Sequence, residues 1–344
     1  MEKSKNIIND STASNIKIDY TNTTNSNANS IINQASSNIE NEALLLKRKA
    51  EKKMNPGCCM DTLFSSKSKR YEDACEFYEK AGKKYKSCQQ WRKAGDCFEN
   101  CSKIKVKLKE SPIKYYQESF FCYSKGNSES NSKRIFEKMN ENLEREGEFY
   151  QAGKNNENLA KQIENDDKYD DAIFYYNQAV KYYEKDGKHD SLKNTIEGKV
   201  ADLMLINNHP DAPTRVPILL ENVAKNYLKN PITKYSAKDY FGKTVLSIIY
   251  YNNNPSEGSI YLNKYKEIDQ TFDESTIYNL CCDIIQSMET NNINSLKYSI
   301  QKYKEISEMD EFMIDILKKI EEKASNNAID MNENNNNLNY EDMR

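Results

Sequence analysis

The sequence predicts an all-α protein built from a helical repeat, and two observations carry this prediction. Residues 71–85 and 169–183 share one pattern, in which aromatic and small residues recur at steps of three and four along one helix face. The residues are Tyr71, Ala74, Tyr78, Ala81 and Tyr85 in the first segment and Tyr169, Ala172, Tyr176, Ala179 and Tyr183 in the second. Large side chains alternating with Ala let stacked helix pairs interlock. Gly and Pro are also scarce, at 10 and 7 of 344 residues, which disfavours tight-turned β architectures.

Composition narrows the function classes. The formal net charge is only -3, so the chain lacks the basic excess that holds a protein on nucleic acid. No apolar run reaches the roughly 18 to 20 residues that cross a bilayer, and residues 1–40 have no apolar signal core. Several of the nine cysteines fall on helical faces, where a free thiol packs as a small apolar group. We therefore expect a cytosolic protein without a disulfide framework.

The first part of the chain is predicted to change from a leader to helices. Residues 1–40 are mostly Asn, Ser, Thr and Ile without helical period, which predicts a disordered leader. A helical pattern starts at Asn41 and is broken by Asn55-Pro56-Gly57, a strong turn signal. The segment 58–66 is short, apolar and loop-like. Further helices are expected over 71–85, 89–98, from Pro112, and over 131–152, 155–165, 169–183, 191–206, 215–228 and 234–251.

The last part of the chain has a different pattern. A loop is expected over 252–258, and over 259–324 the helices lose the Tyr and Ala alternation and become richer in Ile, Leu and Met. This change predicts a C-terminal helical bundle after a repeat region spanning 41–258. Residues 325–344 are predicted to be an Asn-rich linker that ends in a short acidic tail.

The residue pattern gives little support for a catalytic site or a metal site. Ala237 to Thr244 fits the loose form of a phosphate-binding loop, but the Asp-Tyr-Phe within it is bulky and acidic, and no buried strand precedes it. The chain has two histidines, and the spacing of Cys97 and Cys101 is more typical of a packed helix face than of a zinc site. We predict a protein that is not an enzyme and needs no cofactor or metal; an ATPase using Lys243 is the alternative that nucleotide binding would test.

The run Lys234-Tyr-Ser-Ala-Lys-Asp-Tyr-Phe241 resembles a hallmark segment of the α/β-SNAP family, the adaptors that couple the ATPase NSF to SNARE complexes. Similar patterns occur at Tyr71 to Glu76, at Tyr182-Tyr183, at Lys264-Tyr265, over 315–323 and at the tail, so the resemblance covers about residues 42–344. The γ-type relatives lack the 234–241 run, so the α type is favoured. The resemblance implies a tetratricopeptide-like, right-handed twisted sheet of antiparallel helix pairs, followed by a C-terminal helical bundle.

The resemblance also implies partners. Several copies of such a protein lie along a SNARE four-helix bundle, grip its acidic surface mainly through charge, and dock the NSF hexamer with their C-terminal ends. Lys154, Lys234 and Lys238 match SNARE-facing positions, and Lys125 and Lys193 align less directly because an insertion is needed near 186–193. For each lysine the alternative is a solvated helix face without a specific partner.

The loop 58–66 matches a membrane-touching loop of the family. Leu63 and Phe64 are retained, whereas Cys59 and Met60 stand where relatives carry a first Phe pair. Shallow insertion of these apolar residues into the headgroup region would raise the local concentration near membrane-embedded SNAREs. The alternatives are that the loop packs against the first helices, and that Cys58 and Cys59 are S-acylated.

The C-terminal end matches the region through which the family binds and stimulates NSF. Glu341, Asp342 and Met343 correspond to the acidic residues and the apolar residue of the family tail, with Met in place of Leu. Glu289 is retained in a second acidic patch, but Gln286 and Thr290 stand where relatives carry Glu. The sequence therefore predicts a peripherally membrane-associated adaptor for ATP-driven SNARE disassembly in vesicle fusion and transport. A tetratricopeptide-type scaffold for an unrelated peptide is the alternative.

Overall fold

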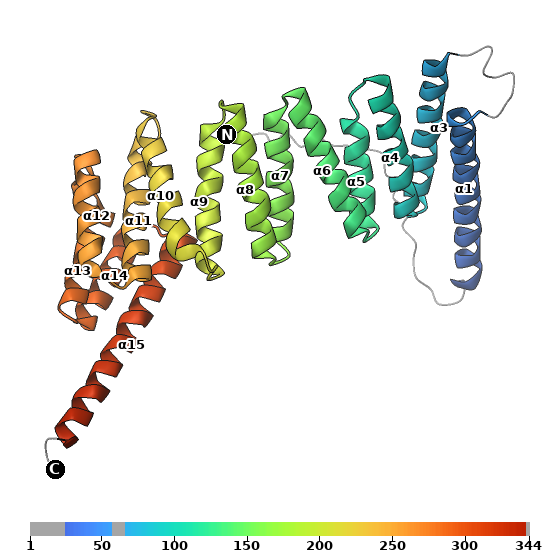
Figure 1. Ribbon diagram of the computed structural model, residues 1–344. Helices are drawn as coiled ribbons and strands as arrows, with labels where there is room; N and C mark the ends of the chain where they lie inside the picture. Colours follow the sequence, from blue (N-terminus) through green and yellow to red (C-terminus); the bar gives the residue numbers. More distant parts are fainter. Residues whose placement is uncertain (1–24, 57–65, 342–344) are drawn as a thin grey trace, which may run out of the picture. The chain divides into compact units, whose positions relative to one another are not determined.

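The computed structural model describes the backbone of residues 25–56 and 66–341 and the side chains of residues 34–56 and 66–326. Within these ranges the chain forms α-helices, two short 3-10 turns and no strand, which confirms the all-α fold (Figure 1). Successive helices pack side by side as helix pairs, as a helical repeat requires. The right-handed twist stays a prediction. The described chain divides into two compact units, which meet in sequence between Asn142 and Leu143.

The first unit is a row of antiparallel helices, each packed on the next. Its helices are α1 (Asn25–Met54), α3 (Lys67–Ser87), α4 (Trp91–Leu108), α5 (Ile113–Lys125) and most of α6 (Glu129–Glu146). The predicted stripe forms the core here: Ala74 and Ala81 are fully buried, and Tyr78 and Tyr85 nearly so. The helices approach so closely that a Cβ on Gly95 would lie 2.8 Å from the ring of Tyr123.

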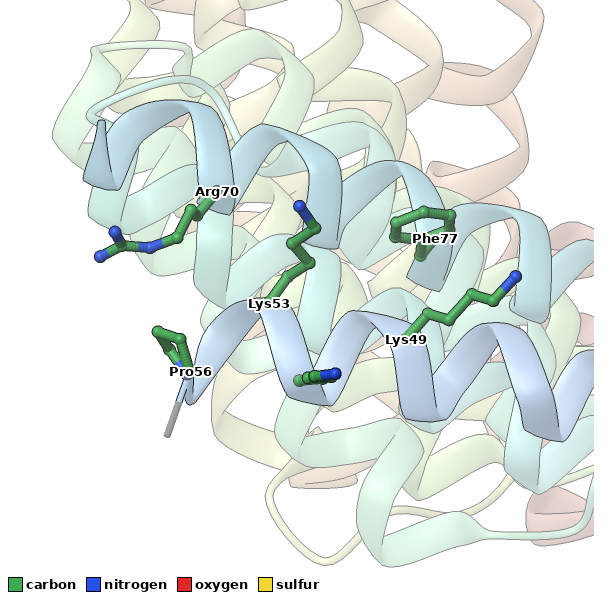
Figure 2. A pocket seen from close by; sticks show the side chains of 6 residues that line it. Lys49, Lys53, Pro56, Arg70 and Phe77 are labelled. Atoms are coloured by element: carbon green, nitrogen blue, oxygen red, sulfur yellow. The ribbon is translucent and has the colours of Figure 1, made fainter. Parts of the chain in front are cut away.

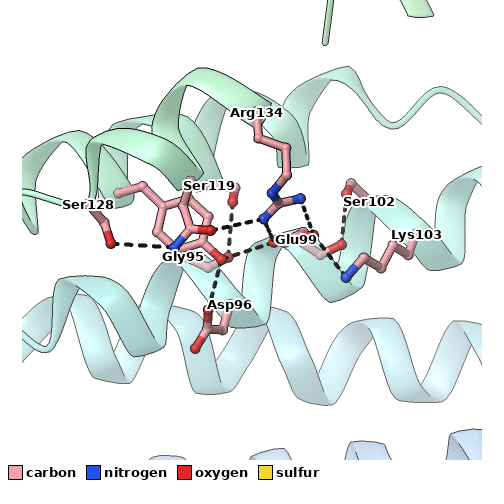
Figure 3. Close-up of polar contacts among 10 residues, drawn as sticks. Gly95, Asp96, Glu99, Ser102, Lys103, Ser119, Ser128 and Arg134 are labelled. Atoms are coloured by element: carbon pink, nitrogen blue, oxygen red, sulfur yellow. Dashed lines mark hydrogen bonds and ion pairs between the residues drawn. The ribbon is translucent and has the colours of Figure 1, made fainter. Parts of the chain in front are cut away.

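A buried ion-pair network joins α4, α5 and α6 in this unit (Figure 3). Glu99 is 6% exposed and accepts two hydrogen bonds from Arg134, of 2.8 and 2.7 Å. It also pairs with Lys103 at 2.8 Å and accepts a 3.0 Å hydrogen bond from the hydroxyl of Tyr123. Burial opposes ionisation of Glu99, but the hydrogen bonds from Arg134 and Lys103 outweigh it and lower the pKa to about 2. The buried carboxylate is therefore fully paired.

The second unit begins with the same helix pairing and ends in a more compact arrangement. Its helices after α6 are α7 (Phe149–Glu164), α8 (Tyr169–Asp186), α9 (Asp190–Ile206), α10 (Ala212–Leu228), η1 (Lys234–Ser236), α11 (Ala237–Asn252), α12 (Pro255–Ile268), η2 (Phe272–Glu274), α13 (Thr276–Glu289), α14 (Ile293–Ile306) and α15 (Glu311–Glu341). Helix α11 packs on α10, α12, α13 and α15, so the last helices fold around it instead of continuing the row (Figure 1). The domain limits 41–258 and 259–324 remain predictions.

The second copy of the repeat pattern also forms the core. Ala172, Ala179 and Tyr183 are fully buried and Tyr176 is 2% exposed. The ring of each tyrosine is buried, whereas its hydroxyl reaches a carboxylate on the preceding helix, as amphipathic aromatic side chains tend to do. Tyr183 donates a 2.7 Å hydrogen bond to Glu157, and Tyr176 donates one of 2.7 Å to Glu164. In the first unit the hydroxyl of Tyr123 has the same relation to Glu99.

The structure corrects one helix boundary. The sequence predicts helices over 131–152 and 155–165, but α6 ends near Gly147, whose φ of +77° suits glycine, and α7 runs through 149–164. Gly153 lies inside α7, where a Cβ would be 2.8 Å from the ring of Tyr183. This glycine therefore serves close helix packing and not a turn.

The phosphate-loop match lies within a helix. Residues 237–252 form α11, so residues 237–244 are the first two turns of a helix and not the strand-to-helix loop that would wrap a phosphate. The side chain of Lys243 is only 7% exposed, and its ammonium group pairs with the carboxylate of Asp310, which precedes α15. A Cβ on Gly242 would lie 2.4 Å from Ile277 of α13. These residues join α11 to the C-terminal helices.

Both predicted irregular ends are partly helical. Helix α1 begins at Asn25, inside the predicted leader, and α15 continues through the predicted Asn-rich linker to Glu341. Each extension grows from an anchored segment: α1 buries Ala43 and Ala50, and α15 buries Phe312 and Ile316. Adding residues to an already formed helix costs little free energy, which explains why polar sequence is helical here.

Candidate binding surfaces

Two of the predicted SNARE-contact lysines lie together at the turn between α10 and α11. Lys234 is exposed in η1, and Lys238 is half-buried in the first turn of α11. The ammonium group of Lys234 is 5.0 Å from the ring centre of Tyr235. Tyr235 and Ile232 are 70% and 87% exposed. The turn therefore offers positive charge beside apolar surface, a combination suited to a protein partner.

Lys193 lies beside this turn. A cleft of about 400 Å³ is lined by residues of α9, of α10 and of the segment leading to η1: Asp190, Ser191, Lys193, Asn194, Asn226, Tyr227, Lys229, Asn230 and Thr233. Lys193 is paired with Glu184 at 3.2 Å and its side chain is 18% exposed. The structure thus brings Lys193 to the cleft that ends next to Lys234, although the two are far apart in sequence.

Lys154 forms an ion pair with a neighbour on its own helix, α7. Its ammonium group lies 3.2 Å from both carboxylate oxygens of Glu157, one turn further along α7. Glu157 is buried and also binds Lys161 and the hydroxyl of Tyr183. Burial opposes ionisation of Glu157, but these hydrogen bonds outweigh it and lower its pKa. With its side chain 36% exposed, Lys154 neutralises a buried carboxylate and still reaches the surface.

Of the remaining predicted site residues, some lie at helix ends in the two units and the others lie outside the described residues. Lys125 is the exposed last residue of α5 in the first unit, and Glu289 is the exposed last residue of α13 in the second. Glu341 ends α15, but its side chain lies outside the described residues. Asp342 and Met343 lie outside them too, as do Cys59, Met60, Leu63 and Phe64 of the predicted membrane loop. Their roles stay predictions.

Sequence reasoning missed the exposed apolar pair Ile232 and Tyr235. The available signal was Asn230-Pro231, which places a turn before the Lys234 run and keeps neighbouring side chains out of a helix interface. Asn230 shapes this turn, since its side-chain oxygen accepts a 2.9 Å hydrogen bond from the amide of Ile232. No helix within the described ranges is long and apolar enough to cross a membrane, and those ranges hold no group of three or more metal-ligating side chains.

Together, the stacked helix pairs define an α-helical repeat protein, whose turn between α10 and α11 exposes basic and apolar side chains. Residues 41–325 match the model of the soluble NSF attachment protein (SNAP) family, and the chain belongs to that family. This membership confirms the resemblance seen in the 234–241 run.

Curated relatives resemble the chain over most of its length. "Vesicular-fusion protein SEC17" of Komagataella phaffii is 29% identical, with 81% of this chain and 94% of that protein covered. The "Probable vesicular-fusion protein sec17 homolog" of Neurospora crassa is 28% identical, with 82% and 97% covered. The human "Alpha-soluble NSF attachment protein" is 25% identical, with 85% and 98% covered. A crystal structure of BtubC from P. vanneervenii aligns with 73% of this chain and 91% of its own at 12% identity, with a TM-score of 0.30 that is too low to bear on the fold.

Proposed function

We propose that this protein is a non-enzymatic adaptor in vesicle fusion and intracellular transport, which binds assembled SNARE complexes and recruits and stimulates the NSF ATPase. The observation that carries the proposal is the family match over residues 41–325, together with relatives named for vesicular fusion and NSF attachment. In this mechanism the ATP belongs to NSF, and the adaptor supplies only binding surfaces. It acts in the cytoplasm, peripherally at membranes, with several copies on one SNARE complex.

The turn around Lys234 is the best supported SNARE contact. Lys234 and Lys238 contribute positive charge there, and Lys193 lies beside it at the cleft. An acidic four-helix bundle would be attracted to this charge, while Ile232 and Tyr235 would add apolar contact that salt does not screen. We therefore expect SNARE binding to weaken with salt without disappearing. Lys154 and Lys125 are proposed as further basic contacts.

The NSF contact is proposed at the C-terminal end. Glu289 offers an exposed carboxylate at the end of α13, and Glu341, Asp342 and Met343 supply the acidic and apolar tail. The loop that carries Cys59, Met60, Leu63 and Phe64 is proposed to touch the membrane. Apolar contact there would keep the adaptor near membrane-embedded SNAREs and raise its effective concentration.

The test is ATP-dependent disassembly of a preformed, soluble SNARE complex by NSF, with and without the full chain. We expect disassembly only when the chain is present. A variant without residues 341–344 should still bind the SNARE complex but should no longer raise the ATPase rate, which separates the two contacts. If the intact chain neither binds the complex nor recruits NSF, the adaptor function is wrong. A helical scaffold for an unrelated peptide then replaces it.

A further inference from the structure

A basic groove lies between α1 and α3 in the first unit, and none of the lysines discussed above lines it. It has a volume of about 320 Å³ and is open to the surface (Figure 2). Its walls are the last turns of α1 and the first turns of α3, and its lining residues are Lys49, Lys52, Lys53, Pro56, Arg70 and Phe77. Figure 2 shows side chains from both helices lying along this seam.

The groove concentrates positive charge in a chain whose net charge is negative. Four of its six lining residues are cationic, and between residues 47 and 73 basic residues outnumber acidic ones by eight to four. Asp73 partly compensates Lys53, with 3.4 Å between the ammonium nitrogen and the carboxylate oxygen. Lys49 and Lys52 are exposed, and no ion pair joins either of them to another described residue. Clustered like charges repel one another, so a bound anion would relieve this repulsion.

The lining chemistry suits a phosphate ester on a carbon ring. Arg presents a planar fork of donors to phosphate oxygens, and Lys binds phosphate as a point charge. Phe77, which is half-buried, and Pro56 add apolar walls that a ring or a glycerol stem can contact. The volume lies at the lower end of the range for small-molecule sites, which excludes large ligands but admits a sugar-sized headgroup.

The position of the groove favours a lipid headgroup over a free phosphate as its ligand. Its walls are the helices on either side of the segment 57–65, because Pro56 follows α1 and Ser66 caps α3. That segment carries Met60, Leu63 and Phe64 in its sequence, and such residues favour the membrane interface. Basic residues beside an interfacial segment bind acidic lipid headgroups. We propose that the groove binds the phosphorylated headgroup of an inositol phospholipid, or of a lipid with an equivalent phosphate monoester.

Flotation of the full chain with vesicles tests this proposal. One vesicle preparation contains phosphatidylinositol bisphosphate in phosphatidylcholine, and the other contains phosphatidylserine at matched surface charge. We expect tighter binding to the first. The triple variant Lys49→Gln, Lys52→Gln, Arg70→Gln should lose about a hundredfold in apparent affinity for it, because each basic residue near a membrane contributes about 1 kcal/mol and three are removed. Because Arg70 is half-buried, the exposed double variant Lys49→Gln, Lys52→Gln is measured in parallel.

A matched control removes the same charge elsewhere in the first unit. Lys107, Lys109 and Lys133 are exposed and outside the groove, so their triple Gln variant should keep the preference for phosphatidylinositol bisphosphate. Equal losses in both triple variants would mean that only net charge matters and would overturn the proposal. Binding of free inositol trisphosphate without any vesicle preference would assign the groove to a soluble phosphate instead of a lipid. The proposal rests on the membrane contact proposed for the loop. The vesicles carry neither SNAREs nor NSF, so loss of the headgroup preference alone leaves the proposed SNARE and NSF contacts untouched, whereas no binding to either vesicle would contradict the loop contact as well.

Discussion

Substitution of Arg134 by Met tests the buried network of the first unit. Glu99 is 6% exposed, and each of its two carboxylate oxygens accepts a hydrogen bond from Arg134 of α6. Methionine keeps much of the side-chain volume but donates no hydrogen bond, so the carboxylate would stay buried with only Lys103 and Tyr123 as partners. Removing one partner of a buried ion pair is strongly destabilising, because the remaining charge has lost water as well as its partner.

The expected magnitude follows from the pKa of Glu99. The network lowers this pKa to about 2 from an ordinary value of 4.5, which corresponds to about 3 kcal/mol of folding free energy. Because the native pKa is below the unfolded one, this contribution is complete above about pH 4.5 and is lost as the pH falls toward 2. Arg134 makes two of the four contacts to the carboxylate, so Arg134→Met should lower the free energy of unfolding by about 2 kcal/mol at neutral pH.

Urea unfolding measures this loss of stability in the first unit, which contains Arg134. The single tryptophan, Trp91, begins α4, so its fluorescence reports on the first unit without mixing in the second. Lys103→Met is the control, because Lys103 pairs with the same carboxylate but its side chain is 54% exposed, and it should cost under about 1 kcal/mol. The variant Arg134→Met should also lose less stability than the wild type between pH 4.5 and pH 2. Equal stability of Arg134→Met and the wild type at pH 7 would refute the reasoning.

Three further outcomes are expected. Gly153→Ala should destabilise the second unit by about 2 kcal/mol in thermal unfolding, because its Cβ would lie 2.8 Å from the ring of Tyr183; an unchanged melting temperature would show that the ring moves freely. Lys234→Glu with Lys238→Glu should weaken binding to a SNARE complex about tenfold at low salt and less at high salt, with helix content unchanged by circular dichroism. Affinity equal to that of the wild type would remove this turn from the interface. Met343→Ala should leave SNARE binding intact and reduce stimulation of the NSF ATPase severalfold, so normal stimulation would end the proposed role of the tail.

The repeat was predictable because its signal is local. The three and four residue spacing of Tyr and Ala determines which helix face is apolar, and both copies of this stripe form the core as expected. The ion pair between Lys154 and Glu157 was not predicted, because the expected helix boundary over 152–155 left Lys154 between two helices, and the sequence cannot show that Glu157 is buried. Burial depends on which helix packs against that face.

The rest of the structure depends on contacts between distant residues. Glu99 and Arg134 are 35 positions apart, and Lys243 meets Asp310 after 67, so no spacing rule connects them. The helix boundary near Gly147 was misplaced because Gly147 and Gly153 read alike in sequence, although one ends a helix and the other receives an aromatic ring. The cleft beside Lys193 arises from α9, α10 and the segment before η1, whose packing the sequence does not specify.

The tyrosine hydroxyls that reach carboxylates on neighbouring helices have a mechanical consequence. Tyr176 and Tyr183 bind two different glutamates along α7, about two helical turns apart, so α8 cannot slide along α7 without breaking both hydrogen bonds at once. These hydrogen bonds add to the resistance that the interlocked side chains of close-packed helices already give. The register between α7 and α8 is therefore fixed both by packing and by these two hydrogen bonds. A force applied to one end of this helix pair is therefore expected to move α7 and α8 together, without one helix sliding along the other.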